Sequence, residues 1–461
     1  MVGTVGPSSL ALETVSQFDS RLLDPSNRRE WQLSYLAEEV RQGLELVATR
    51  KPSVESVGID GTAAGFGFLA DGKPICNPAR WGVARPAHAS AWAAFERLGH
   101  WRLPVTYYYL AQSCPDVIER ADTLLLAPQL LAYVLGGDPV GESTYAVSAG
   151  LGSSFTGTWA TDLLADWGLR IDLLPSMADH GAAIGQLVDH PFDSPPAIRV
   201  VAGHDTSSAV LAVPFTTEDS VFLSTGSWFV PGIELDEPVV SRAVFEAGAE
   251  TLRGVGEKYH LVRNLPGFSI LERWRRDREQ AGVEMSYERL LAAAAVAEPC
   301  RTLVATSDDR LRGENGSVDD GLAAYARATG QPIPSSDGAV TRCLLESLAV
   351  ECAVVLDDLC DLAAVSPSRL YLVGGGARND LLCRFVAEAT NLPVIAGAPA
   401  AASIGNVLVQ AMGAGTLSSI AAGRALVEDN VAFSRFVPDQ QSRWGTARQR
   451  MRRLLAEAEP A

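Results

Sequence analysis

Residues Ile198–Val213 read IRVVAGHDTSSAVLAV, and this stretch indicates the fold class of the chain. The apolar run Ile198–Ala202 predicts a buried strand, and the small and apolar residues Ser207–Val213 predict a helix. The polar cluster Gly203–Thr206 lies between them, where α/β proteins commonly form sites. Asp205 at that point could accept a proton from a substrate hydroxyl. The alternative is that Asp205 only caps the helix.

The rest of the chain also alternates between strand and helix patterns, which predicts an α/β protein throughout. A strand pattern at Ser56–Asp60 is followed by Gly65–Leu69 and an Asp71-Gly72 turn, which together indicate a hairpin. Helices are expected at Trp31–Arg50, Thr123–Leu135 and Leu344–Leu362, with a charged, solvent-exposed helix at Arg443–Ala458. A chain of 461 residues exceeds the usual size of one core, so we predict two domains, 1–213 and 214–461.

Two later stretches each place glycines in a turn after a predicted strand. Ser224–Trp228 combines hydroxyl side chains with a glycine, which lets the backbone approach a phosphate closely; an ordinary β-turn is the alternative. Val373–Asn379 holds three consecutive glycines between a strand and a helix, a pattern that favours a phosphate or adenine site. A plain turn stays open as the alternative there too.

The composition argues against several classes of function. The formal net charge is −17, and a surface this acidic repels nucleic acids and anionic lipid. The sequence has no glycine loop ending in Lys-Ser/Thr, no GxSxG motif and no membrane-spanning apolar run. No signal peptide opens the chain, and the seven cysteines are scattered without a CxxC pair. We therefore expect a reduced, cytoplasmic protein that binds neither nucleic acid nor membrane.

No metal site is indicated by the six histidines, because none of them share a ligand spacing. Mg²⁺ is nevertheless compatible with the sequence, since it needs only one or two carboxylates together with substrate phosphates. The sequence does not identify its protein ligands.

Taken in order along the chain, these stretches resemble the FGGY carbohydrate kinases, from about Leu10 to Gly415. Gly203–Thr206 is similar to the family's His-Asp-Thr motif, and Ser224–Trp228 to its Ser-Ser-Gly-Thr-Trp motif. Val373–Asn379 resembles the family's adenine-side glycine turn. Further matches are Ala247–Glu250, Arg263–Gly267, Leu271–Arg273 and Ile404–Asn406.

The resemblance implies two actin-like (ribonuclease-H-like) α/β ATPase domains with a cleft between them. It also implies transfer of the γ-phosphoryl group of ATP to a ketose hydroxyl with Mg²⁺, by a monomer or homodimer. Members that act on 6-deoxyketoses such as rhamnulose are the most similar. The resemblance assigns Asp205 as the proton acceptor. It assigns sugar contacts to His204, Thr206, Asn264 and Ala63, and nucleotide contacts to Ser227, Gly226, Glu272, Gly374, Gly375, Gly376 and Asn379.

Three departures from the family pattern bear on activity. The family's first strand and phosphate hairpin, Asp-Leu-Gly-Ala-Ser-Ser-Gly-Arg, has no counterpart before Ser9–Glu13. Thr62 and Gly65 replace a tryptophan and an aspartate, and Ala79–Gly82 replaces a Tyr-Arg-Asp segment. For the missing hairpin, a start codon assigned too far downstream is one explanation, and a real truncation that cripples catalysis is the other. For the two sugar-side changes, a wider sugar pocket is one interpretation, and relaxed selection on an inactive site is another. The alternative hypothesis is therefore a catalytically impaired homologue that binds sugar or nucleotide; a hydrolase on the same fold is a third.

Overall fold

The computed structural model describes residues 1–20, 22–23, 28–51, 53–62, 65–81, 88–215, 219–312, 316–439 and 442–458. These residues form two compact units. The first unit comprises Met1–Pro214, Glu234–Leu261 and Ala401–Val431, and the second comprises Phe215–Ile233, Val262–Ala400 and Ala432–Ala461. The predicted ranges were 1–213 and 214–461. The units differ from them because the chain returns to the first unit twice, at Glu234–Leu261 and at Ala401–Val431.

The first unit opens with an antiparallel hairpin of β1 (Val2–Val5) and β2 (Leu10–Glu13). A separate sheet has the order β10 (Ala183–Gln186), β11 (Ala197–Arg199), β5 (Ser56–Val57), in which β11 and β5 run parallel. An isolated parallel bridge between Gly61 and His204 continues that pairing beyond both strands. The polar cluster predicted from the sequence thus lies where the carboxyl ends of two parallel strands meet.

A larger sheet of the first unit has the order β3 (Leu22–Leu23), β4 (Arg28–Trp31), β8 (Ala79–Trp81), β6 (Phe66–Ala70), β7 (Lys73–Pro74), with β9 (Thr123–Leu126) paired to β6. Asp71 and Gly72 have φ angles of 50° and 70° and close the β6–β7 hairpin, which confirms the predicted turn. The expected helix at Thr123–Leu135 is wrong in its first turn. Thr123–Leu126 pairs with β6, and helix α5 (Ala127–Val134) starts only afterwards, with Pro128 in its first turn.

Helices pack around these sheets. The predicted helix at Trp31–Arg50 is confirmed as α1 (Leu33–Ala48), whose Val47 joins a core with Leu135, Ile184 and Ile198. The other elements of this unit are α2 (His88–Leu98), α3 (Val105–Ser113), α4 (Pro115–Arg120), α6 (Ser143–Ser148), α7 (Thr161–Asp166), η1 (Ile171–Leu173), α9 (Arg242–Glu246), β14 (Glu250–Arg253) and β15 (Tyr259–Val262).

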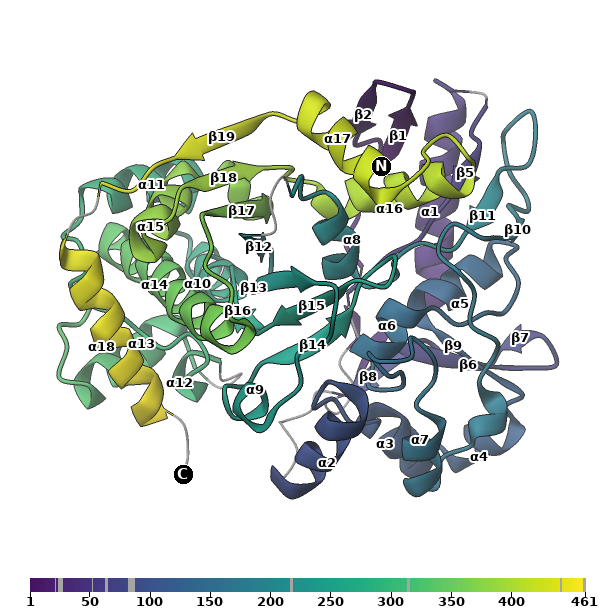
Figure 1. Ribbon diagram of the computed structural model, residues 1–461, viewed down its shortest axis with the longest axis horizontal. Helices are drawn as coiled ribbons and strands as arrows, with labels where there is room; N and C mark the ends of the chain where they lie inside the picture. The colour runs from purple at the N-terminus through teal and green to yellow at the C-terminus, as the bar shows by residue number, and fades with distance from the viewer. Residues whose placement is uncertain are drawn as a thin grey trace. The chain divides into compact units, whose positions relative to one another are not determined.

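Two helices from distant parts of the sequence lie side by side in the first unit. Helix α8 (Asp205–Leu211) packs on α16 (Ala401–Gly413), and α17 (Ile420–Asn430) follows α16 (Figure 1). The contact is close because Gly405 has no side chain: a Cβ there would lie 1.8 Å from the Ser208 carbonyl oxygen. This packing is the reason that 401–431 belongs to the first unit.

The sheet of the second unit has the order β13, β12, β17, β18, β19. β12 (Ser220–Thr225) pairs antiparallel with β13 (Trp228–Leu235) and parallel with β17 (Arg369–Gly374). β18 (Val394–Gly397) runs parallel to β17, β19 (Phe433–Phe436) is antiparallel to β18, and β16 (Leu265–Pro266) pairs with β13. The strands predicted before the two glycine turns form as β12 and β17.

The helices of the second unit are α10 (Ser269–Gln280), α11 (Tyr287–Val296), α12 (Asp309–Arg312), α13 (Val318–Ala328), α14 (Asp337–Ala363), η2 (Gly375–Arg378), α15 (Asp380–Thr390) and α18 (Ser442–Ala458). The long helix predicted at Leu344–Leu362 is α14. The helix predicted at Arg443–Ala458 forms as α18, but it is exposed to solvent on only part of its surface. Trp444 and Met451 are buried where α18 packs on α14 and α15, because the polar residues of α18 occupy only its other face.

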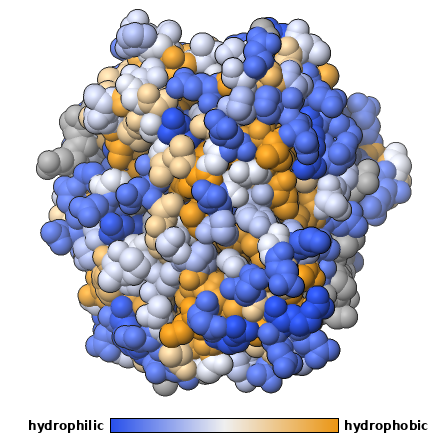
Figure 2. Space-filling model, turned by 90° about the vertical axis from the view of Figure 1, so that its right-hand side faces the viewer, coloured by the Kyte–Doolittle hydropathy of each residue, from blue (hydrophilic) through white to orange (hydrophobic). Residues whose placement is uncertain are grey.

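Figure 2 shows hydrophilic residues interspersed with hydrophobic ones on one face, which is ordinary for a folded chain. Among the described helices, none combines the length and the apolar character needed to cross a bilayer. None of the seven cysteines, all within the described ranges, forms a disulfide bond.

Candidate functional site

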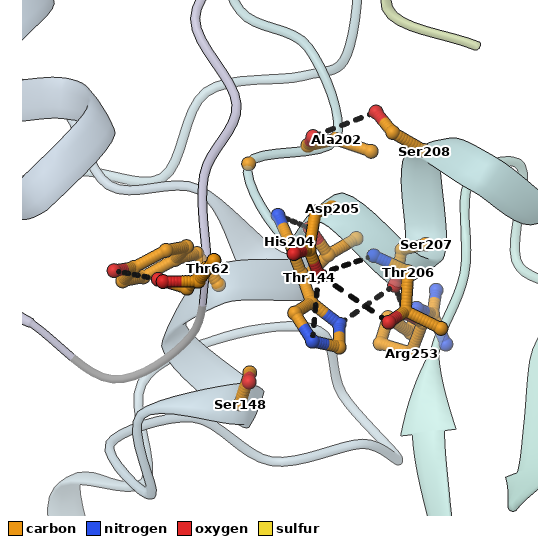
Figure 3. Close-up of polar contacts among 12 residues, drawn as sticks. Thr62, Thr144, Ser148, Ala202, His204, Asp205, Thr206, Ser207, Ser208 and Arg253 are labelled. Atoms are coloured by element: carbon orange, nitrogen blue, oxygen red, sulfur yellow. Dashed lines mark hydrogen bonds and ion pairs between the residues drawn. The ribbon is translucent and has the colours of Figure 1, made fainter. Parts of the chain in front are cut away.

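Asp205 is the first residue of helix α8, and the residue before it, His204, is the N-cap. The alternative in which Asp205 is the N-cap residue therefore does not match the structure. One carboxylate oxygen, Oδ1, accepts a hydrogen bond of 2.6 Å from the backbone N–H of Thr206 and one of 3.3 Å from its hydroxyl (Figure 3). The Asp205 side chain is 38% exposed.

Burial, and to a smaller extent the charge of Asp60, together raise the pKa of Asp205 to about 6. A carboxylate with this pKa is ionised at neutral pH and yet more basic than an ordinary aspartate, which suits a general base. Asp60 is itself held by the side-chain amide of Asn406, at 2.5 Å. Burial also raises the pKa of Asp60, so the two carboxylates form one electrostatic unit.

His204 lies against Asp205 as a neutral ring. Its Nε2 is 3.6 Å from Asp205 Oδ1, and its Nδ1 is 3.4 Å from the Ser207 hydroxyl (Figure 3). Burial, with a smaller contribution from the charge of Arg102, lowers the pKa of His204 to about 3. A neutral imidazole can donate or accept a hydrogen bond without competing for the proton that Asp205 would take. His204, Asp205 and Thr206 thus lie together at the start of α8, and their contacts to a sugar stay a prediction.

The hydroxyl of Tyr145 binds the backbone of both Thr62 and Gly65. The Tyr145 hydroxyl donates to the Thr62 carbonyl at 2.8 Å and accepts the Gly65 N–H at 3.1 Å. Gly65 does not widen this region, because a Cβ there would lie 2.6 Å from the Trp31 ring. The space that a larger residue would need at position 65 is filled by Trp31. Ala63, predicted to contact sugar, lies outside the described residues.

The two glycine turns meet in the second unit through Thr225, the last residue of β12. Its hydroxyl donates to the Val373 carbonyl at 2.6 Å and accepts the Gly376 N–H at 2.9 Å. A Cβ on Gly374 would lie 2.3 Å from the Thr225 carbonyl oxygen, and one on Gly376 would lie 2.6 Å from its hydroxyl. At Gly375 the nearest atom would be 4.0 Å away. Packing therefore requires two of the three glycines, and the middle one faces open space.

The other residues predicted to contact nucleotide lie in these turns or in the helices α10 and α15 of the second unit. The Gly226 and Ser227 carbonyls accept N–H groups from Phe268 and Gly267, at 3.1 and 3.0 Å, just before α10. Asn379 caps α15 by accepting the Leu382 N–H at 3.0 Å. Glu272 lies in the first turn of α10, where its carboxylate pairs with Arg275 at 3.1 Å. Asn264, predicted to contact sugar, lies between β15 and β16 in this unit.

Sequence reasoning missed three residues that hold these groups in place: Glu142, Asp60 and Thr225. Asp60 and Thr225 stood inside quoted motifs but carried no chemical assignment. No sequence motif surrounds Glu142 that would mark it as part of the site. It belongs there because it binds the backbone N–H of Gly203, which is 61 residues away. Among the described residues, no group of three His, Cys, Asp or Glu side chains could hold a metal ion.

Comparison with known proteins points to one family. The model of the "FGGY family of carbohydrate kinases, C-terminal domain" matches residues 221–414. A rhamnulokinase of Bacteroides thetaiotaomicron is 32% identical over 97% of this chain and 95% of its own length. A rhamnulokinase of Klebsiella pneumoniae is 29% identical over 95% of this chain and 91% of its own.

Solved structures of sugar and polyol kinases share the fold. The xylulose kinase of Rhodospirillum rubrum superposes with a TM-score of 0.75 at 18% identity, covering 95% of this chain and 92% of that one. The Plasmodium falciparum glycerol kinase with ADP gives a TM-score of 0.74 at 14% identity, covering 96% and 92%. At such identities the likeness concerns the fold alone.

Proposed function

Because this chain belongs to the FGGY family of carbohydrate kinases, we propose that it transfers the γ-phosphoryl group of ATP to a ketose hydroxyl. We propose L-rhamnulose as the ketose and L-rhamnulose 1-phosphate as the product. The similarity over nearly the whole chain to proteins named rhamnulokinase supports this choice of sugar. The observation that carries the activity is the partly exposed Asp205 carboxylate, whose pKa burial raises to about 6.

In the proposed reaction, Asp205 takes the proton of the sugar hydroxyl as that oxygen attacks the γ-phosphorus. A new O–P bond forms, the bond between the γ-phosphorus and the β–γ bridging oxygen breaks, and ADP leaves. Phosphoryl transfer depends mainly on positioning and charge neutralisation, so a single base is sufficient. The neutral His204 and the hydroxyl of Thr206 are suited to bind sugar hydroxyls beside it, because each can donate or accept a hydrogen bond.

For the nucleotide we propose the turns around Thr225 and Gly375. Gly375 leaves open space where a phosphate or the adenine could approach the backbone closely. Mg²⁺ would enter with ATP, bound mainly by phosphate oxygens, and we assign it no protein ligand. We also propose a cytoplasmic location, because the reaction consumes ATP and no disulfide joins the cysteines.

A coupled assay of ADP release tests the proposal. Purified protein is given Mg²⁺-ATP with L-rhamnulose, L-xylulose, D-xylulose, glycerol or gluconate, and ³¹P NMR identifies the phosphorylated hydroxyl. We expect the highest kcat/KM with L-rhamnulose and the phosphate on O1. Equal turnover of all the compounds, or none with any ketose, would contradict the proposal.

The catalytically impaired homologue is the second candidate. It is favoured by the replacement of sugar-side residues at Thr62 and Gly65. It predicts that calorimetry detects binding of sugar or ADP while the coupled assay shows no sugar-dependent ADP release. The same preparation therefore separates the two candidates.

A further inference from the structure

A second carboxylate, buried beneath the catalytic turn, is bound only by hydrogen-bond donors. Glu142 is completely inaccessible to solvent. Its Oε1 accepts the Thr144 N–H at 2.6 Å and His180 Nε2 at 2.7 Å. Its Oε2 accepts the Thr144 hydroxyl at 2.9 Å, the Tyr145 N–H at 2.9 Å and the Gly203 N–H at 3.0 Å. A buried carboxylate whose two oxygens accept this many hydrogen bonds is held in one position.

These bonds join helix α6 to the backbone immediately before Asp205. Glu142 holds the N–H of Gly203, and the Thr144 hydroxyl accepts the N–H of His204 at 3.2 Å. The position of residue 203 favours glycine, because a Cβ there would lie 2.6 Å from Glu142 Oε2.

The other side of the same turn is bound to Gly61. The Gly61 N–H donates to the Gly203 carbonyl at 2.9 Å, and the Asp205 N–H donates to the Gly61 carbonyl at 3.1 Å. Three consecutive N–H groups, those of residues 203, 204 and 205, are therefore all fixed by groups outside the turn. Only the first two depend on Glu142 and Thr144.

The charge state of Glu142 suits this role. Burial alone would raise its pKa, but His180 and the N–H groups of Thr144 and Tyr145 together hold the pKa below its ordinary value. Glu142 therefore stays ionised and accepts hydrogen bonds at both oxygens across the pH range in which a kinase works.

We propose that Glu142, acting with Thr144, is the positioning residue of the reaction: it fixes the Gly203-His204 backbone and so sets where the Asp205 carboxylate points. The proposal rests on the proposed function of Asp205 as the base. Glu142 has no exposed surface and so does not touch substrate; its effect reaches the reaction only through the turn. Proton transfer to a misplaced base is slow, and an error of about 1 Å costs up to about 100-fold in rate.

Glu142→Gln is the direct test. The amide has nearly the shape of the carboxylate, but its NH₂ group must face a backbone N–H, either that of Thr144 or those of Tyr145 and Gly203. We expect kcat to fall about 10- to 100-fold with little change in KM for ATP, and the Asp205 carboxylate to move in a crystal structure of the variant.

Thr144 supplies a milder pair of variants in case Glu142→Gln does not fold. Thr144→Val removes the hydroxyl that bonds Glu142 and His204 and is expected to lower kcat, whereas Thr144→Ser keeps the hydroxyl and is expected to restore it. Glu346→Gln is the matched control, since Glu346 is also buried and accepts the Cys300 N–H at 2.7 Å, in the second unit. It is expected to lower the unfolding temperature and leave kcat unchanged.

Two results would overturn the inference. One is a kcat within twofold of the wild type in both Glu142→Gln and Thr144→Val. The other is an Asp205 carboxylate that keeps its position in the crystal structure of either variant. If the wild type itself releases no sugar-dependent ADP, the proposed function fails, while the position of Asp205 in the variants still decides whether Glu142 fixes the turn.

Discussion

At the scale of single residues, the site depends on how its surroundings change the acidity of ordinary side chains. Burial and the charge of Asp60 raise the pKa of Asp205 to about 6, and burial lowers that of His204 to about 3. The two effects leave a basic carboxylate beside a neutral imidazole. Environments that separate the pKa values of neighbouring groups in this way are typical of acid–base sites.

Asp205→Asn is expected to lower kcat about 100- to 10,000-fold, because it removes the general base. It should not lower stability at pH 7.5. The folded-state pKa of Asp205 is raised above its ordinary value, so its contribution to stability is present below about pH 4 and is lost as the pH rises through about 6. Thermal unfolding at pH 4 and 7.5 measures this. A variant that unfolds at a lower temperature than the wild type only at pH 7.5 would contradict the pKa assignment.

The activity should rise with pH through a midpoint near the pKa of Asp205, about 6, when kcat/KM for the sugar is measured, because that ratio reports on the free enzyme. Asp60→Asn removes the charge that raises this pKa and should move the midpoint to lower pH. The change is nearly isosteric, since asparagine can still accept the hydrogen bond from Asn406. A midpoint that stays in place in the variant would show that Asp60 does not influence Asp205.

At the scale of secondary-structure elements, the close contacts of individual glycines show where the packing leaves no room for a side chain. The sequence predicts Gly374, Gly375 and Gly376 as one motif, but the three residues differ in how closely they approach β12. Gly374 and Gly376 make room for Thr225, and Gly374 also has a φ of 86°, in the region that favours glycine. The sequence could not distinguish them, because their partner lies about 150 residues earlier.

Paired variants of this turn should separate structure from binding. Gly376→Ala places a methyl group against Thr225 and is expected to lower the free energy of unfolding by about 1–3 kcal/mol. In Gly375→Ala the new methyl group faces open space, so the unfolding temperature of the variant should stay near the wild-type value. The KM of the variant for ATP should rise several-fold, because the methyl group occupies space proposed for the nucleotide. Denaturant unfolding and ATP titrations measure the two effects. Equal loss of stability in both variants would mean that Gly375 is also packed.

The α8–α16 contact gives a further test at this scale. Gly405→Ala would place a methyl group 1.8 Å from the Ser208 carbonyl, so the helices must separate. Because α8 begins with Asp205, we expect a loss of stability of about 1–3 kcal/mol or more together with a lower kcat. Gly423→Ala is the control, since the three atoms nearest to its Cβ would all belong to the Leu408 side chain, at 3.3 Å or more, and not to the backbone. A Gly405→Ala variant with wild-type stability would contradict the close packing.

At the scale of the whole molecule, charge is the most unusual property. A net charge of −17 on 461 residues implies repulsion among surface carboxylates, which opposes the compact state. Raising NaCl from 0.05 to 0.5 M shortens the screening length from more than 10 Å to less than 5 Å. We therefore expect the unfolding temperature to rise by about 1–4 °C. A steady fall with salt would mean that stabilising ion pairs, such as Arg102–Glu250, outweigh the repulsion.

The sequence by itself determined the α/β class, several of the strands and helices around the candidate site, and the family. The comparisons confirm the fold class and the family. Those features depend on local periodicity, on turn residues and on the order of motifs along the chain, all of which can be read without coordinates. The sequence-based prediction was wrong at Thr123–Leu126, where a segment with a helical pattern pairs with β6 as a strand. It was incomplete for α18, where a charged helix also has a buried face.

Only the tertiary structure decided how the groups of the site are held and charged. Glu142 reaches Gly203 across 61 residues, and Asn406 reaches Asp60 across 346. Burial and hydrogen bonding between such distant segments fix both the position and the pKa of a side chain. Neither quantity is written in the neighbouring sequence, because both depend on which other parts of the chain exclude water from it.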